Sequence, residues 1–226
     1  MGPEKRPKEP QYQIQFDAYK TKGPVCLGPT TSHLWRSDPR HLSFLLARYK
    51  IVAKLLSGKK NVLEVGCGDA FAIDIVLQEV KSVMGVDFDP LFIEFAAKLQ
   101  EGRENCSFKV VDFTIDTVDG QFDAVYALDV IEHINKNAEN SFMENICKSL
   151  KPKGICILGT PSIESQKYAL EWSEAGHVNC KTGSDLKALL LKYFHNAFVF
   201  SMNDEMIHLG FYPMAHYLIG IGVDGK

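Results

Sequence analysis

The stretch Val62-Leu63-Glu64-Val65-Gly66-Cys67-Gly68-Asp69-Ala70 decides the fold of this chain. It reads as a strand that runs into a turn with two glycines, followed by an amphipathic segment. Gly66 and Gly68 have no Cβ, so the backbone can bend sharply there and approach a ligand closely. A helix that begins near Ala70 points its free N–H groups at the same place. The order of strand, glycine turn and helix predicts a binding site where the strand ends.

The rest of the chain repeats the alternation of short apolar runs and amphipathic stretches. It predicts strands over 61–65, 82–86, 107–111, 122–128 and 154–158, and helices over 39–57, 70–79, 90–99, 138–150 and 182–193. Such an alternation indicates an α/β fold, with a parallel sheet and helices on both faces.

Two further apolar runs, 195–202 and 207–217, are separated only by the polar turn Asn203-Asp204-Glu205. A crossover between parallel strands needs a dozen or more residues, so these two strands cannot both be parallel to their neighbours. We therefore expect a mostly parallel seven-stranded sheet whose last strand is antiparallel.

The composition is that of an ordinary globular protein and excludes several classes of partner. The chain has 226 residues, 46% of them hydrophobic, and a formal charge of -3, which gives no general attraction to nucleic acid or an anionic membrane. The charged N-terminus is no secretory signal, and no run approaches the ~20 apolar residues of a membrane span. The six cysteines are scattered without a C-x-x-C pair, as in a reducing compartment. We expect a cytoplasmic protein without nucleic-acid or membrane partners, and a homo-oligomer is compatible with the sequence.

Two aspartates follow the next strands of the predicted sheet. Asp87 ends the second strand, 19 residues beyond Gly68, and so is expected beside the glycine turn. A carboxylate there suits a ribose, whose two hydroxyls can donate to its two oxygens. Asp112 closes the third strand and can accept a hydrogen bond from an adenine amino group, with Phe113 or Phe88 against the ring. The edge of the sheet thus predicts an adenosine site.

These motifs resemble those of class I S-adenosylmethionine (SAM)-dependent methyltransferases. The resemblance rests on Glu64-Val65-Gly66-Cys67-Gly68, Gly85-Val86-Asp87, Phe122-Asp123-Ala124-Val125 and Leu150-Lys151-Pro152-Lys153-Gly154, which follow one another in the family's order. It implies a Rossmann-like methyltransferase fold with SAM as cofactor. The implied cofactor-binding residues are Glu64, Gly66, Cys67, Gly68, Asp87, Phe88, Asp112, Phe113, Leu128 and Asp129.

Composition and capping residues indicate how the chain is divided. Residues 1–10 are expected to be a disordered tail, and 11–58 an N-terminal lid and a helix packed on the core. In that helix Asp38 is the expected N-cap, before Pro39, and Gly58 ends the helix. Residues 59–226 would form the SAM-binding domain, with a substrate loop at about 160–181. Tyr19, Trp35, Arg36 and His41 are expected to pack as a helical cap, and the alternative is an aromatic lid with Arg36 as its cationic anchor.

Two other functions remain open as alternatives. A NAD-dependent oxidoreductase would use the same type of sheet, but its fingerprint needs a third glycine where this chain has Phe71. A non-catalytic SAM-binding or assembly protein would keep the cofactor residues without turnover.

The residues expected to act on the acceptor are Asp129, His133 and His177. Asp129, Glu132 and His133 share one face if the segment turns helically. Such a trio resembles one linked to a metal in quinone-biosynthesis O-methyltransferases, but the same pattern occurs in small-molecule methyltransferases that need none, so we expect no metal. His133 is a candidate general base. His177 lies in the substrate loop with Tyr168 and Trp172, and is either a second base or a structural histidine.

The expected reaction is methyl transfer from SAM to an oxygen or nitrogen of a small-molecule acceptor. A natural product, a sugar or a quinone-like metabolite would each fit. Much of the catalysis in such an in-line displacement comes from proximity and orientation.

Overall fold

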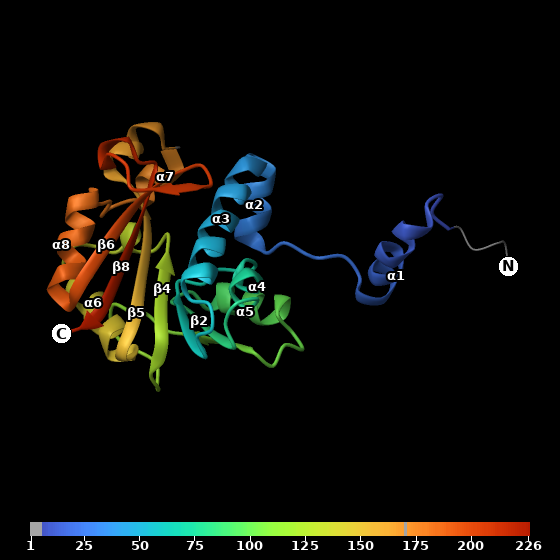
Figure 1. Ribbon diagram of the computed structural model, residues 1–226, viewed down its shortest axis with the longest axis horizontal. Coiled ribbons are helices and arrows are strands. Elements are labelled where there is room, and N and C mark those ends of the chain that lie inside the picture. Colours follow the sequence, from blue (N-terminus) through green and yellow to red (C-terminus); the bar gives the residue numbers. More distant parts are fainter. Residues whose placement is uncertain (1–5, 170) are drawn as a thin grey trace.

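The computed structural model describes residues 6–169 and 171–226. Its centre is one sheet of eight strands in the order β3-β2-β1-β4-β5-β8-β6-β7 (Figure 1). The strands are β1 Asn61–Val65, β2 Ser82–Asp87, β3 Cys106–Val110, β4 Phe122–Leu128, β5 Leu150–Pro161, β6 Phe194–Asn203, β7 Met206–His208 and β8 Tyr217–Gly225. β1 to β5 pair in parallel, whereas β8 lies antiparallel between β5 and β6.

Helices cover both faces of this sheet. On one face α3 (Pro39–Leu55), α4 (Ile73–Val76) and α5 (Pro90–Leu99) bury side chains such as Val52, Ile73 and Ala96 in one apolar cluster. On the other face α6 (Glu139–Ser149) and α8 (Gly183–Tyr193) contribute Ile146 and Leu190 to a second cluster. The central strand β4 is buried along nearly its whole length, as expected for a strand covered on both faces.

The predicted Rossmann-like α/β fold is confirmed, with eight strands in place of seven. The last strand does run antiparallel, but it spans Tyr217–Gly225 and not 207–217. The region predicted as one strand instead forms β7, a single 3-10 turn at Tyr212–Met214, and the first residue of β8. Pro213 has no N–H to donate to a strand ladder, so the chain turns there.

The predicted helix over 70–79 is also shorter than expected, since only Ile73–Val76 is α-helical. The turn after Gly68 continues through Ala70, whose φ of 52° is incompatible with a right-handed helix. The Asp69 side chain accepts the Phe71 N–H at 3.3 Å, which fixes this extended turn. Helix and strand limits elsewhere agree with the prediction to within a few residues.

The N-terminal part consists of three helices. α1 (Gln13–Lys22), preceded by a 3-10 turn at Pro10–Tyr12, has no buried residue and stands apart from the sheet in Figure 1. α2 (Pro29–Ser37) packs on α3. Asp38 caps α3 by accepting the Arg40 N–H at 3.1 Å, as predicted. Residues 1–5 of the expected tail lie outside the described part of the chain.

Three short helical segments complete the structure around the ends of the strands. They are a 3-10 turn η2 at Ile131–His133, a 3-10 helix η3 at Ile163–Tyr168 and the helix α7 at Glu171–Gly176. All six cysteines are free thiols. Within the described residues, no helix has the length and apolar character that crossing a bilayer requires.

Candidate functional site

The glycine turn and Asp87 meet where β1 and β2 end. Gly66 and Gly68 both have positive φ, of 76° and 52°. Gly68 donates its N–H to Asp87 Oδ2 at 3.0 Å, and Asp89 donates its N–H to Asp87 Oδ1 at 3.0 Å. Each carboxylate oxygen of Asp87 is therefore fixed by one backbone donor and keeps a lone pair for another. The predicted proximity of Asp87 to the glycine turn is present in the structure.

The two glycines have different surroundings. A Cβ at Gly66 would lie 2.3 Å from Val130 Cγ2, whereas a Cβ at Gly68 would meet no atom within 4 Å. Gly66 is therefore required by packing against the segment after β4. Gly68 is the glycine whose α-carbon faces open space.

Asp112 lies beyond β3, and the Val111 N–H donates to the Asp87 carbonyl oxygen at 2.9 Å. The Oδ1 atom of Asp112 accepts hydrogen bonds from the N–H and the hydroxyl of Thr114, at 2.8 and 2.6 Å, which orients the Asp112 carboxylate. The two phenylalanines proposed for the adenine ring are placed differently. Phe113 is 3% exposed and belongs to the core, whereas Phe88 is 72% exposed. Of the two rings, Phe88 is the one that is accessible at the surface.

Glu64 and Cys67, expected near the cofactor, are enclosed by protein. Glu64 accepts the hydroxyl of Tyr49 at 2.5 Å and that of Tyr126 at 2.9 Å. Burial raises the pKa of Glu64 to about 8, although both tyrosine hydrogen bonds act in the opposite direction. Burial also raises the pKa of the Cys67 thiol, and the side chain is 4% exposed. Both side chains are therefore buried in the core, where they support the glycine turn by packing.

Asp129, directly after β4, is held by a residue that the sequence analysis did not single out. Arg48 Nη1 lies 2.8 Å from both carboxylate oxygens of Asp129. The guanidinium also stacks on the Tyr217 ring, 3.8 Å from its centroid. The sequence does contain a sign of this role, because a charged residue at position 48 falls on the apolar face of its helix, between Leu45 and Val52. Arg36, considered as an alternative cationic anchor of the lid, is exposed on α2.

Leu128, the last residue of β4, is 5% exposed and belongs to the core cluster on the α3 face of the sheet. The Leu128 side chain can therefore offer only apolar packing to the cofactor region.

Glu132, His133 and His177 form a second group beside Asp129. One ligand atom from each lies within 4.8 Å of the others, and the two imidazole centroids are 5.1 Å apart. The Nδ1 atom of His133 is 2.9 Å from the Gly176 carbonyl oxygen, and that of His177 is 2.7 Å from Gln166 Oε1. If each Nδ1 carries the proton for these acceptors, each Nε2 is left with a lone pair.

Glu132 makes this group suitable for a cation. The residue is fully buried, its Oε2 accepts from the Thr160 hydroxyl at 3.0 Å, and its Oε1 has no hydrogen-bond partner among the described residues. Burial, followed by the charge of Asp129, raises the pKa of Glu132 to about 8. One carboxylate and two imidazoles are the donor set of many divalent-metal sites. The trio expected from the sequence thus has His177 in place of Asp129, which pairs with Arg48.

The substrate loop reaches this group directly. The Asn179 N–H donates to the Glu132 carbonyl oxygen at 2.9 Å, and Gly176 contacts His133 as described. Burial, then the neighbouring His133, lowers the pKa of His177. Tyr168 is 79% exposed, and the side chain of Trp172 lies outside the described part of the structure.

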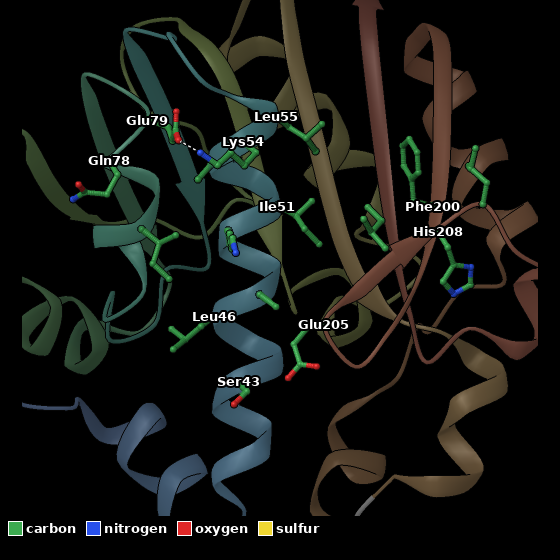
Figure 2. A pocket seen from close by; sticks show the side chains of 16 residues that line it. Ser43, Leu46, Ile51, Lys54, Leu55, Gln78, Glu79, Phe200, Glu205 and His208 are labelled. Atoms are coloured by element: carbon green, nitrogen blue, oxygen red, sulfur yellow. Dashed lines mark hydrogen bonds and ion pairs between the residues drawn. The ribbon is translucent and has the colours of Figure 1, made fainter.

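A cleft of about 1100 Å³ lies elsewhere, along α3 and toward β6 and β7. Figure 2 shows Leu46, Ile51 and Leu55 of α3 on one side, and Phe200 and His208 on the other. None of the residues expected at the site lines it. The chemistry-bearing groups are therefore at the carboxyl ends of the strands and not in this cleft.

The comparisons with known proteins agree with the site's architecture. Residues 63–158 match a family model described as a methyltransferase domain. The ubiquinone biosynthesis O-methyltransferase of Rickettsia bellii is 30% identical over 139 residues, which are 61% of this chain and 56% of that protein. The chain thus spans about half the length of the curated relatives it matches.

Solved structures share the fold at low identity. The methyltransferase domain of a bacterial Hen1 has a TM-score of 0.66 and 17% identity, over 81% of this chain and 100% of that one. The N-methyltransferase NodS from Bradyrhizobium japonicum, in complex with S-adenosylhomocysteine, has a TM-score of 0.61 and 16% identity, over 85% and 92% of the two chains. The match at residues 63–158 identifies a methyltransferase domain in that part of the chain, and the sheet order and the glycine turn are those of the Rossmann-like fold of methyltransferases that use S-adenosylmethionine as cofactor.

Proposed function

We propose that this protein transfers a methyl group from SAM to an oxygen of a small-molecule acceptor. The observation that carries the proposal is the adjacency of two groups at one edge of the sheet. Gly68 and Asp87 lie at the ends of β1 and β2. Asp129 and His133 follow the neighbouring strand β4, and the loop after β5 brings the His177 imidazole to 5.1 Å from that of His133.

The roles proposed for these residues define one orientation of the cofactor. Asp87 would accept the ribose hydroxyls, and Asp112 would accept the adenine amino group with Phe88 over the ring. Gly66 and Gly68 would follow the methionine part, which leaves the sulfonium methyl group directed toward Asp129. In this arrangement Glu64, Cys67, Phe113 and Leu128 support the site from the core.

An oxygen acceptor is favoured over nitrogen by the second group. A hydroxyl must lose its proton during methyl transfer, whereas a neutral amine can attack as it is. With the Nδ1 atoms of His133 and His177 facing oxygen acceptors, each ring can present Nε2 to a hydroxyl, as a general base requires. The relatives named for ubiquinone biosynthesis are O-methyltransferases, so a phenolic, quinone-like acceptor is the first to test.

A divalent cation held by Glu132, His133 and His177 is the alternative to a histidine base, because it would occupy the Nε2 lone pairs of both rings. Such a cation would lower the pKa of an acceptor hydroxyl bound to it. Asp129 would then remain with Arg48, beside the reacting oxygen.

The lid and the loop complete this proposal. Within the expected lid at 11–58, α2 would cover the cofactor from one side, whereas α1 stands apart, and the loop at about 160–181 would cover the acceptor from the other side. Asn179 and Gly176 already contact η2, which supports the placement of the loop.

Isothermal titration with SAM tests the cofactor site. Asp87→Ala is expected to weaken binding by about 1.5–3 kcal/mol, the usual contribution of a charge-assisted hydrogen bond. Asp89→Ala is the matched control, because the Asp89 side chain caps α5 through the Leu91 N–H and the change keeps the backbone N–H that donates to Asp87. If the wild-type protein does not bind SAM at millimolar concentration, the proposed function is wrong.

Methyl transfer from labelled SAM to a catechol such as 3,4-dihydroxybenzoate tests the reaction. Labelled product that depends on His133 or His177 supports it. A protein that binds SAM but labels no acceptor in a metabolite extract would instead be a non-catalytic SAM-binding protein.

A further inference from the structure

The ion pair between Arg48 and Asp129 joins two distant parts of the chain. Arg48 belongs to α3, outside the matched methyltransferase domain at 63–158. Asp129 is the first residue after β4, and its N–H donates to the Gly159 carbonyl oxygen at 2.9 Å. The side chains of Arg48 and Asp129 are 14% and 29% exposed, so solvent screens this pair weakly.

The energetics of this ion pair argue against a purely structural role. Asp129 has a φ of 56°, in the left-handed region where a residue with a Cβ is strained. Within the described part of the chain, Arg48 Nε is buried without a hydrogen-bond partner. A partly buried ion pair that leaves one of its own donors unsatisfied adds little net stability. Strained and unsatisfied groups of this kind cluster at functional sites.

Tyr49, the residue next to Arg48 in α3, binds a second acid at the same edge of the sheet. Arg48 holds Asp129 after β4, and the next residue, Tyr49, holds Glu64 in β1. Two consecutive residues of one helix thus fix the ends of the two adjacent strands between which the sulfonium would lie. β1 and β4 are paired in parallel, so both acids lie at the same edge of the sheet.

We propose that Arg48 is a positioning residue for methyl transfer, which acts through Asp129. Arg48 holds the Asp129 carboxylate in its left-handed backbone position, facing the space between the sulfonium and the acceptor. Asp129 then orients the acceptor hydroxyl by accepting its hydrogen bond. This inference rests on the proposed function, and it adds a residue from outside the methyltransferase domain to the reaction.

The test separates cofactor binding from turnover. Arg48→Met keeps the length of the side chain but removes the charge and the fork. We expect the Kd for SAM to change by less than about threefold, whereas kcat with 3,4-dihydroxybenzoate falls by about 100-fold, as for a reacting group misplaced by about 1 Å. Arg48→Gln replaces this variant if Arg48→Met does not fold.

A double-mutant cycle then asks whether Arg48 acts through Asp129. Arg48→Met combined with Asp129→Asn is expected to have the kcat of Asp129→Asn alone, because Arg48 has nothing left to position. Losses that multiply in the double variant would overturn the proposal, as would an equal loss of kcat and SAM affinity in Arg48→Met. Lys151→Met is the control, because it removes the cation 2.8 Å from Asp123, at the opposite end of β4. It should leave kcat unchanged.

A structural readout distinguishes failure of this inference from failure of the proposed function. If the wild-type protein binds SAM but methylates no acceptor, the crystal structure of Arg48→Met with S-adenosylhomocysteine still tests Arg48. We expect Asp129 to leave its positive-φ conformation, or its carboxylate to move by about 1 Å or more. An Asp129 that stays in place without Arg48 would show that the arginine does not position it.

Discussion

Thr31 donates both its backbone N–H and its hydroxyl to a single oxygen of Asp69, at 2.9 and 3.1 Å. Both residues are buried, and they join α2 to the turn that follows Gly68. A Cβ at Gly28 would lie 2.4 Å from the Asp69 side chain, so this junction is closely packed. The segment before the methyltransferase domain is therefore attached directly to the glycine turn.

Replacing Thr31 with Val should weaken this attachment. The hydroxyl is lost but the backbone N–H still reaches Asp69, so we expect the free energy of unfolding to fall by about 1.5–3 kcal/mol, the range for a hydrogen bond to a charged group. Urea denaturation followed by circular dichroism measures it. Thr21→Val is the matched control, because the Thr21 hydroxyl donates to the Asp17 carbonyl oxygen on exposed α1. A Thr31→Val protein as stable as this control would contradict the prediction.

The two glycines of the turn should respond differently to alanine. Both have positive φ, so either change strains the backbone by roughly 1 kcal/mol. Gly66→Ala also forces a Cβ to within 2.3 Å of Val130 Cγ2, and we expect a marked fall in melting temperature. Gly68→Ala adds a methyl group in open space, so the fold should survive while SAM affinity falls.

Calorimetric melting and titration with SAM separate these outcomes. The double change Gly66→Ala with Val130→Ala should regain part of the stability that Gly66→Ala loses, because the overlapping methyl group is gone. Equal melting temperatures for Gly66→Ala and Gly68→Ala would refute the assignment of separate packing and binding roles.

Glu64 predicts a pH dependence of stability. Its pKa in the folded protein is about 8, against an ordinary glutamate pKa of 4.5, so the folded state binds the extra proton between these two pH values. Stability from this group is therefore complete below pH 4.5 and is lost as the pH rises toward 8, by at most about 1.4 kcal/mol per pH unit. Glu64→Gln removes the titration but can still bond both tyrosine hydroxyls.

We expect Glu64→Gln to have a flatter profile of unfolding free energy from pH 5 to 8, and to exceed the wild-type protein in stability at pH 8. Chemical denaturation at several pH values provides this comparison. Tyr126→Phe, which removes one of the hydrogen bonds that favour the carboxylate, should steepen the decline. Parallel profiles for Glu64→Gln and the wild-type protein would rule out Glu64 as the titrating group.

The sequence alone predicts the parts of the structure that depend on the order of neighbouring residues. The glycine turn, its neighbour Asp87 and the α5 limits follow from residues close together in the chain. The last strand was misplaced because Tyr217–Gly225 contains three glycines, which disfavour strands by composition. In the structure a Cβ at Gly222 would lie 2.4 Å from the Phe194 ring, so the absence of a side chain makes room for the ring at the end of α8.

The residues around the acceptor were harder to predict because they meet through the tertiary fold. Arg48 and Asp129 are 81 residues apart, and their pairing depends on how α3 crosses the sheet. His177 was singled out, but nothing in the chain order indicated that the substrate loop would bring it beside His133. Local pattern gave the residue types, and packing determined their partners.

The group of Glu132, His133 and His177 predicts binding of a divalent cation, which the sequence analysis did not expect. The second ring nitrogen of each histidine is held by a carbonyl or amide oxygen, an arrangement that fixes metal-binding imidazoles. We expect about one equivalent of Zn²⁺ per chain after incubation and dialysis, measured by mass spectrometry of the metal. His177→Ala should reduce this stoichiometry well below one, because two ligands alone bind weakly. His208→Ala is the control, since His208 is exposed and contacts Asn203 at 2.9 Å. Metal contents that are equal in the wild-type protein and His177→Ala would exclude the cation site and leave the two histidines as candidate bases, because their Nε2 atoms would then serve the acceptor directly.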